Sequence, residues 1–337
     1  MSAVFQVLPG QPVPVAEIAA RLAHLWADEA DHGRPAPGRE DAKASQINLV
    51  VHFGFGTTPA DALVQFRHAV DFASRYPSRV VVLCPHEPAA PIHEMSAKIY
   101  GECFLGRTPG DARCCEFVLL SYPFAARRFL ESQVSICLTP DLPLYYWAHA
   151  FTDCGRMADY NYLLTKAQRF LFDSAAAPTG AIDFAWPRPE NVRDLAYARI
   201  LPVRQALGQF LARHPPVQLA TGLREIVVTH GAPLAAEGNA LVRWATARLH
   251  ACGAPAGVPH LTLVARAPDS LGLELRYDNA SQFVWIGRLG GGEACLAADF
   301  GDTTSRLTTP IHLLPPETAL ADAMFFQDSE PATPARQ

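Results

Sequence analysis

A loop with two glycines is the part of this chain where residue types and spacing could support chemistry. The segment His52–Pro59 contains Gly54 and Gly56 between a strand-like run and a helix-like run, and such a loop can hold a phosphate at a helix N-terminus. The dinucleotide fingerprint is incomplete, because Pro59 occupies the position of its third glycine. The sequence therefore leaves open a sugar-phosphate or nucleotide-binding α/β enzyme that uses Gly54 and Gly56, beside a plain strand-to-helix connection.

Other candidate chemistry is sparse. His86, His93, Glu94 and Cys103 are metal-ligand types, but zinc sites usually combine two closely spaced pairs and only His93 and Glu94 are adjacent. The chain has no Gly-x-Ser-x-Gly elbow, no Walker motif and no His-Glu-x-x-His motif. We therefore expect no catalytic residue, no metal and no cofactor.

The eight cysteines are scattered and include no Cys-x-x-Cys pair. In a chain of this length they are predicted to be buried small hydrophobes and not a disulfide framework. Cys114 and Cys115 are adjacent in a strand-like run, where successive side chains point to opposite faces, so a bond between these two is discounted.

A proline-flanked turn precedes a run of aromatic residues. Pro140 and Pro143 fix φ and remove two backbone donors, which predicts a sharp turn with Asp141 facing solvent. The run Tyr145–Trp147 follows at once. Tyr and Trp are enriched at protein interfaces because they bury much area at low entropy cost, so these side chains either contact a partner or fill a core between sheet and helices.

Size and charge exclude several classes of function. The chain has 337 residues, 49% of them hydrophobic and 18% charged, and a net charge of -5, which indicates about two globular domains. No basic stripe is present, which argues against nucleic acid and anionic membranes as partners. The first residues lack a basic and then apolar secretory pattern, and no apolar run is long enough to span a membrane, so we expect a cytoplasmic protein.

The elements that would position these residues follow an α/β pattern. Residues 15–30 read as an amphipathic helix that docks on its own chain or reaches a partner, and a polar Pro/Gly-rich linker follows. The first region then predicts strands at 47–53, 79–84, 98–105, 113–121, 134–138, 142–151 and 169–174, with helices at 59–75, 124–133 and 155–167. The strand–helix–strand unit 47–84 implies a mixed, mostly parallel sheet flanked by helices.

The second region is predicted to be α/β with a more antiparallel sheet. It contains a long helix over 191–214 bent at Pro202, a strand at 224–229, a helix over 234–251, strands at 261–265, 271–277, 282–288 and 293–299, and a closing helix at 315–326. The Ala-, Gly- and Pro-rich stretch 175–189 marks the boundary. The predicted domains are an N-terminal helix and linker (1–45), an N-terminal α/β domain (46–175), a C-terminal α/β domain (190–326) and a disordered tail (327–337).

The order of several motifs resembles the OpcA family, the assembly and activator proteins of glucose-6-phosphate dehydrogenase, over roughly residues 46–320. These motifs are Ile47–Val51, Tyr76–Leu83, the Pro140–Pro143 turn with its aromatic strand, Phe172–Ser174, Asp194–Arg199 and Pro202–Arg204. The family often reads Leu-Trp-Trp where this chain has Tyr145–Trp147, and often has Trp where this chain has Tyr197 and Val203. The resemblance is therefore that of a divergent member.

The resemblance implies a non-catalytic accessory protein that binds glucose-6-phosphate dehydrogenase and favours its assembled, active form in the oxidative pentose phosphate pathway, which supplies NADPH. The residues then expected to contact the partner are Asp141, Tyr145, Trp147, Tyr197, Arg199 and Arg204. Tyr197 and Arg204 are seven residues apart and share a helix face, whereas Arg199 points elsewhere. A ligand-sensing module without an enzyme partner remains a third possibility.

Overall fold

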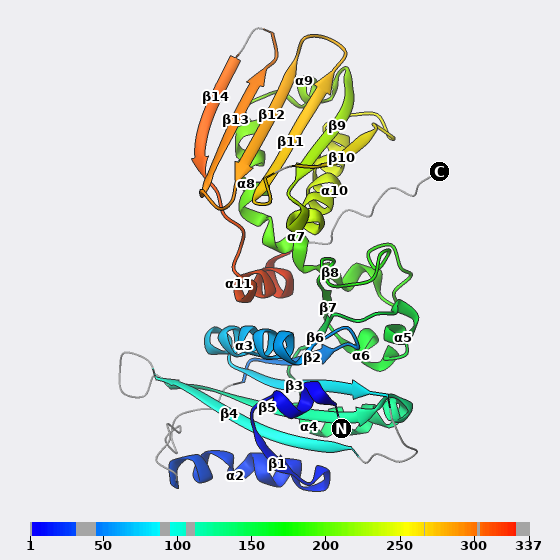
Figure 1. Cartoon of the computed structure of the whole chain (residues 1–337), viewed down its shortest axis with the longest axis vertical. Coiled ribbons are helices and arrows are strands. Elements are labelled where there is room, and N and C mark those ends of the chain that lie inside the picture. The colour runs from blue at the N-terminus through cyan, green and yellow to red at the C-terminus, as the bar shows by residue number, and fades with distance from the viewer. Residues whose placement is uncertain are drawn as a thin grey trace. The chain divides into compact units, whose positions relative to one another are not determined.

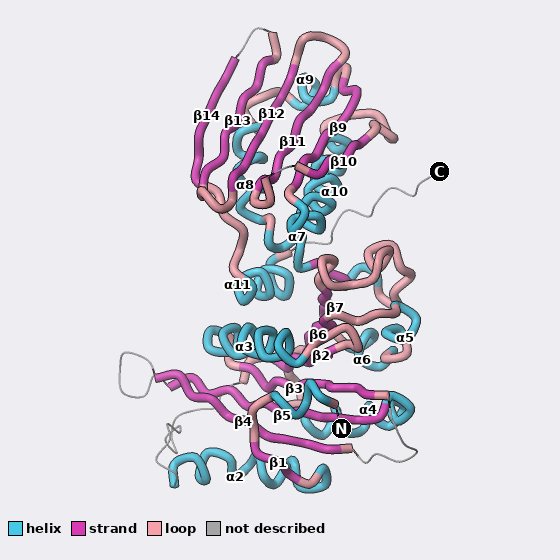
Figure 2. Tube along the Cα trace, in the orientation of Figure 1, coloured by secondary structure: helices cyan, strands magenta, loops and turns pink. Residues whose placement is uncertain are grey.

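The computed structural model describes residues 2–31, 45–87, 95–105, 112–265, 267–301 and 304–327. They form two compact units: one comprises the described residues up to Asp194 and from Leu320 onward, and the other runs from Leu195 to Ala319. Each unit is built on one sheet with helices packed against it (Figure 2), so the predicted α/β class with two regions is confirmed. No helix in the described ranges is long and apolar enough to cross a membrane.

The sheet of the first unit is mixed and mostly parallel. Its strand order is β1-β4-β5-β3-β2-β6-β7-β8, with only the β1–β4 and β4–β5 pairs antiparallel. The strands are β1 (Gln11–Val13), β2 (Ile47–Phe53), β3 (Ser78–His86), β4 (Ser96–Leu105), β5 (Ala112–Pro123), β6 (Leu144–His149), β7 (Arg169–Phe172) and β8 (Val192–Asp194). All residues of β2 and β6 are buried, as expected for central strands covered on both faces (Figure 1).

Helices cover both faces of this sheet. They are α1 (Ala3–Val7), η1 (Val15–Glu17), α2 (Ile18–Asp31), α3 (Pro59–Arg75), η2 (Phe124–Phe129), α4 (Leu130–Cys137), α5 (Cys154–Ala158), α6 (Asn161–Lys166) and η3 (Pro189–Asn191). One core cluster joins α2, α4, α5 and α6 to one face, while α3 packs on β4 and β5. Ile18, Leu22 and Leu25 are buried in that cluster, so the N-terminal helix docks on its own chain.

The predicted strand at 134–138 is wrong, because these residues lie in or directly after α4. Leu130, Val134 and Cys137 are the buried residues of α4, at the i, i+4, i+7 spacing of one helix face. The start of α3, in contrast, is as predicted: Pro59 stands at its first turn, and the Thr58 side chain accepts a hydrogen bond from the Asp61 amide at 3.2 Å.

The sheet of the second unit has the order β10-β9-β11-β12-β13-β14, in which only β9 and β10 are parallel. Its strands are β9 (Leu223–His230), β10 (His260–Val264), β11 (Ser270–Tyr277), β12 (Gln282–Arg288), β13 (Glu293–Asp299) and β14 (Thr304–Pro310). The edge strand β14 was not predicted, because its residues are largely polar and largely exposed, and show no apolar alternation. The helices here are α8 (Leu201–Leu211), α9 (Pro216–Ala220), η4 (Ala232–Leu234) and α10 (Ala235–Ala251).

The predicted long helix over 191–214 is divided into three elements. Val192–Asp194 form β8, residues Leu195–Arg199 form α7, and α8 begins after Ile200, which leaves helical geometry at ψ 13°. Pro202 lies in the first turn of α8, where the backbone N–H that it lacks would have no intrahelical partner. A new helix therefore begins there, in place of the predicted bend in one long helix. Asp194 therefore belongs to a strand, and the chain passes from the first compact unit to the second between Asp194 and Leu195.

At the other end, the chain rejoins the first unit within α11 (Pro316–Ala321), which continues into the π-helix η5 (Asp322–Phe326). The predicted closing helix over 315–326 corresponds to these two elements. The predicted tail lies outside the described residues after Gln327. Separate folding of 46–175 and of 190–326 stays a prediction.

The reading of all eight cysteines as thiols is wrong for one pair. Cys103 on β4 and Cys114 on β5 are directly opposite in the antiparallel register, with their Cα atoms 4.1 Å apart, and form a disulfide. The sequence could not reveal this pair, because strand register decides which cysteines meet.

The pairing predicts a count of labelled thiols. Alkylation of the air-oxidised, denatured chain should label six cysteines, and alkylation after reduction should label all eight, as measured by intact mass. Cys103→Ser should leave the other six thiols and expose Cys114 to the reagent without reduction. Eight labelled cysteines before reduction would contradict the bond.

Candidate partner-binding site

The Pro140–Pro143 turn is held by a buried amide from β2. The Asn48 side chain, 2% exposed, donates from Nδ2 to the carbonyls of Thr139 at 2.9 Å and Leu142 at 3.2 Å, and its Oδ1 accepts from the Thr139 amide at 2.9 Å. These three bonds fix the turn against the sheet. Asp141 at its tip is exposed and adopts φ 65°, a left-handed conformation that Asp tolerates better than most residues. Asp141 is thus presented to solvent on a rigid turn.

Tyr145 and Trp147 do not lie on the surface. They are 6% and 3% exposed on β6, and Phe325 of η5 packs on the Tyr145 ring at 5.5 Å between centroids. The Tyr145 hydroxyl donates to Oε1 of Gln168 at 3.2 Å, and burial raises the pKa of the phenol. Of the two alternatives given above, these two side chains therefore fill the core. They support the turn that precedes them and are not accessible to a partner.

In the second unit, the predicted residues form two local contacts. The guanidinium of Arg204 on α8 lies 4.0 Å from the ring centroid of Tyr197 on α7, which gives a cation–π contact between the two helices. Arg199 points elsewhere, as predicted, and its Nε donates to Oε1 of Glu237 on α10 at 2.7 Å. Tyr197 is 3% exposed, whereas Arg199 and Arg204 are both half-buried.

The six predicted residues therefore fall into two groups, Asp141, Tyr145 and Trp147 in the first unit, and Tyr197, Arg199 and Arg204 in the second. Sequence reasoning missed Asn48, Phe325 and Glu237, which hold these groups in place. Asn48 had one sequence signal, since it is a polar residue inside an apolar strand run. Phe325 and Glu237 contact residues that are far away in the sequence, and no local sequence pattern marks them.

The glycine loop is explained by close packing. The Gly54 amide donates to the His149 carbonyl at 2.8 Å, and the Gly56 amide donates to the Ala150 carbonyl at 2.9 Å. A Cβ on Gly54 would come within 2.4 Å of the Phe151 Cα. The two glycines thus let the loop after β2 approach the loop after β6, and their N–H groups are not available to a phosphate. The phosphate-binding enzyme alternative finds no support in this geometry.

Two histidines lie at the carboxyl ends of the parallel strands. His149 Nε2 is 2.6 Å from Oδ2 of Asp61 on α3, and this contact lowers the pKa of the Asp61 carboxyl against the opposing effect of its partial burial. On the other face of the sheet, His52 lies beside a cavity of about 20 Å³, which is room for one water molecule and not for a substrate. Of the metal-ligand types named above, His93 and Glu94 lie outside the described residues, and no metal-binding cluster occurs within them.

Comparison with known proteins agrees with the motifs. The family model described as the glucose-6-phosphate dehydrogenase subunit N-terminal domain, OpcA, matches residues 69–185. This stretch contains the C-terminal part of α3, the strands β3 to β7 and the Asp141 turn. No curated protein matches the chain. The family match supports a role associated with glucose-6-phosphate dehydrogenase, and it identifies residues 69–185 as the N-terminal domain of the OpcA family.

Proposed function

We propose that this protein is a non-catalytic accessory subunit that binds glucose-6-phosphate dehydrogenase and promotes its assembled, active conformation. The observation that carries the proposal is the Asp141 turn, which is exposed, fixed by Asn48 and contained in the stretch that matches the family. A rigid turn loses little conformational entropy on binding, and it can offer a carboxylate to a basic group of the enzyme. The protein would work in the oxidative pentose phosphate pathway, without a cofactor of its own.

Direct contacts are assigned to the accessible members of the predicted set. Asp141 and Arg204 would contact the enzyme, while Tyr145, Trp147, Tyr197 and Arg199 would hold the surfaces around them. Activation needs only that the protein binds the active conformer more tightly than the inactive one. A coupling free energy of about 1–3 kcal/mol would change the apparent affinity of the enzyme for its substrate by roughly 5- to 150-fold.

Asp141→Asn is expected to weaken enzyme binding about 10-fold or more, because a charge-assisted hydrogen bond contributes about 1.5–3 kcal/mol. Asn also tolerates the left-handed backbone of this position, so the variant changes the charge and not the turn. The measurement is a titration of the protein into the cognate dehydrogenase, with NADPH production followed at subsaturating glucose-6-phosphate.

Asp183→Asn is the matched control, since Asp183 is also an exposed aspartate within the matched stretch. It should activate like the natural chain. Unchanged activation by Asp141→Asn would remove Asp141 from the interface. No activation and no co-elution with the natural chain would overturn the proposed function itself.

A further inference from the structure

The sheet of the second unit has one face without helices. The helices α8 and α10 share a core cluster with the side chains of Leu273, Phe283, Trp285 and others on one face. The strand register places the alternate residues of each strand on the opposite face, which we name the open face. Its members used below are Leu261, Leu263, Glu225, Glu274, Arg276, Val284, Ile286, Arg288, Glu293, Cys295, Asp299 and Arg306.

The open face carries exposed apolar side chains along the middle of its strands. One row across the sheet reads Leu263, Thr229, Gly272, Ile286 and Cys295, and the next reads Leu261, Val227, Glu274, Val284 and Ala297. Leu261 and Leu263 on the edge strand β10 are 39% and 42% exposed, and Ile286 on β12 is 52% exposed. A sheet normally buries its apolar side chains against another layer, so these exposed rows are typical of an interaction surface.

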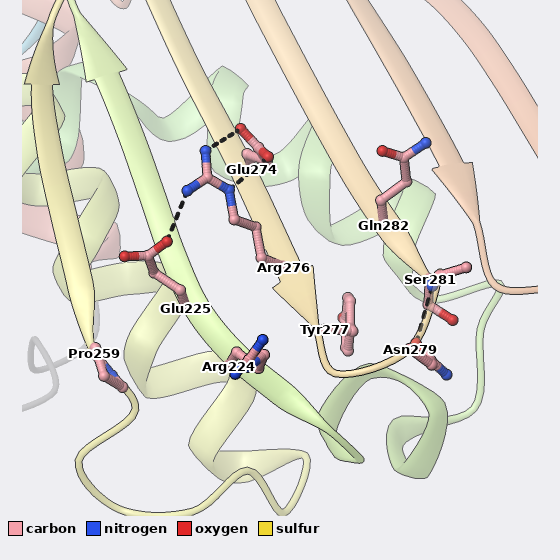
Figure 3. Close-up of a pocket in the computed structure, with 10 residues that line it drawn as sticks. Arg224, Glu225, Pro259, Glu274, Arg276, Tyr277, Asn279, Ser281 and Gln282 are labelled. Atoms are coloured by element: carbon pink, nitrogen blue, oxygen red, sulfur yellow. Dashed lines mark hydrogen bonds and ion pairs between the residues drawn. The ribbon is translucent and has the colours of Figure 1, made fainter.

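Charged residues of both signs lie within and beside these rows. Figure 3 shows Arg276 between Glu225 and Glu274, with contacts of 2.8 Å to each carboxylate. With the β11–β12 turn, these residues line a hollow of about 550 Å³ at one end of the strands. Arg288 stands directly opposite Glu293 in the register. Because each guanidinium of the hollow already meets carboxylates, the hollow does not fit a free anion or a partner of one charge sign.

This distribution of charge fits a surface that meets itself. In an isologous interface the same patch occurs on both sides, so each residue type must find its complement within the patch. The open face supplies both signs in nearly equal number: Arg276, Arg288 and Arg306 against Glu225, Glu274, Glu293 and Asp299.

The open face is large enough for a stable interface. Six strands spaced about 4.8 Å apart and seven residues of about 3.3 Å each give a footprint of roughly 650 Å². A standard interface buries about 800 Å² on each partner, so face-to-face contact of two copies reaches that range. We propose that the open face is a dimer interface, in which two copies of this chain pack their second-unit sheets face to face as a sandwich. This proposal does not depend on the proposed function.

The test is the solution mass of the full chain by light scattering across a concentration series. The natural chain should show twice its 36.6 kDa mass at micromolar concentration. Ile286→Arg, which buries two charges at the centre of the proposed interface, should show the monomer mass. Val217→Arg is the control, because Val217 is 68% exposed on α9, away from the sheet. It should remain dimeric, and circular dichroism should show both variants folded.

A natural chain that stays monomeric at all concentrations would overturn the proposal, as would a dimer that Ile286→Arg leaves intact. A monomeric natural chain that loses dehydrogenase binding on Ile286→Arg would assign the face to the enzyme and would equally reject the dimer. Glu274→Arg is a second variant, at a charged position of the open face. It should weaken the dimer by an intermediate amount, and a monomer–dimer equilibrium unchanged by it would count against self-complementary charge.

Discussion

Lowering the pH from 7 to 4 is expected to cost the first unit about 3 kcal/mol of unfolding free energy through His52 alone. His52 is 1% exposed on β2, and burial lowers the pKa of its imidazole to about 3. An unfolded histidine titrates near 6.5. Below that pH the unfolded chain binds a proton that the folded chain does not bind. The contribution of His52 to stability is therefore complete above pH 6.5 and is lost as the pH falls toward 3.

The surroundings of His52 keep this effect separate from other titrations. Its Nδ1 lies 2.7 Å from the Tyr146 hydroxyl oxygen, and its ring meets Tyr160 edge-on at 4.5 Å. Burial raises the pKa of both phenols, so both tyrosines are neutral throughout this pH range. The Asp61 carboxyl, whose pKa is lowered, contributes only below its usual value of 3.8.

His52→Gln isolates the effect, because it keeps a hydrogen-bonding side chain and removes the titrating group. The variant should be less stable than the natural chain at pH 7.5, and it should lose less stability between pH 6.5 and 4.5. Denaturant unfolding at several pH values, with hydrogen exchange of β2 amides to report on the first unit, measures both. His260→Gln, at an exposed position, controls for loss of a histidine. Parallel pH curves for His52→Gln and the natural chain would show that His52 does not carry the acid sensitivity.

The sequence predicted the parts of the fold that local pattern controls. Continuous apolar runs identified β2 and β3, and Pro59 identified the start of α3, because burial on both faces and a helix N-terminus each have a local signature. Tyr197 and Arg204 were expected on one face of a single helix, and they do meet, but from α7 and α8 on the two sides of Ile200.

Contacts between distant segments could not be predicted. Asn48 binds a turn 91 residues away, the disulfide depends on the register of β4 and β5, and Phe325 covers Tyr145 from the far end of the chain. Whether a side chain is buried depends on such long-range contacts. The composition of the aromatic strand alone therefore suggested an interface, while packing buries Tyr145 and Trp147 in the core. Asp141 remained accessible because it lies in the connection between α4 and β6, and such connections run over the surface.

Arg199→Met is expected to destabilise the second unit by about 3–5 kcal/mol, the usual cost of leaving a buried charge without its partner. Arg199 ends α7, and its Nε lies 2.7 Å from Oε1 of Glu237 in the first turn of α10. The Glu237 side chain is 5% exposed, so water cannot replace the lost guanidinium. The positions at a helix C-terminus and a helix N-terminus also suit the two charges.

The double variant Arg199→Met, Glu237→Leu should recover most of this loss, because an apolar pair of similar volume removes the buried charge together with its partner. Arg224→Met is the matched control in the same unit: its ion pair with Asp278, at 2.8 Å, is about two-thirds exposed on both sides and should contribute less than about 1 kcal/mol. Chemical denaturation of the natural chain, Arg199→Met, Glu237→Leu and the double variant gives the coupling free energy of the Arg199–Glu237 pair, with Arg224→Met measured beside them. Equal losses of unfolding free energy for Arg199→Met and Arg224→Met would show that the buried pair contributes no more than the exposed pair.

The same double variant decides whether Arg199 also contacts the enzyme. If the folded double variant activates the dehydrogenase as the natural chain does, Arg199 acts only by joining α7 to α10. If it is stable but fails to activate, while Arg224→Met activates normally, Arg199 belongs to the contact surface with Arg204. Stability and activation must therefore be measured on the same samples, since the single variant would lose both for a reason that has nothing to do with the partner.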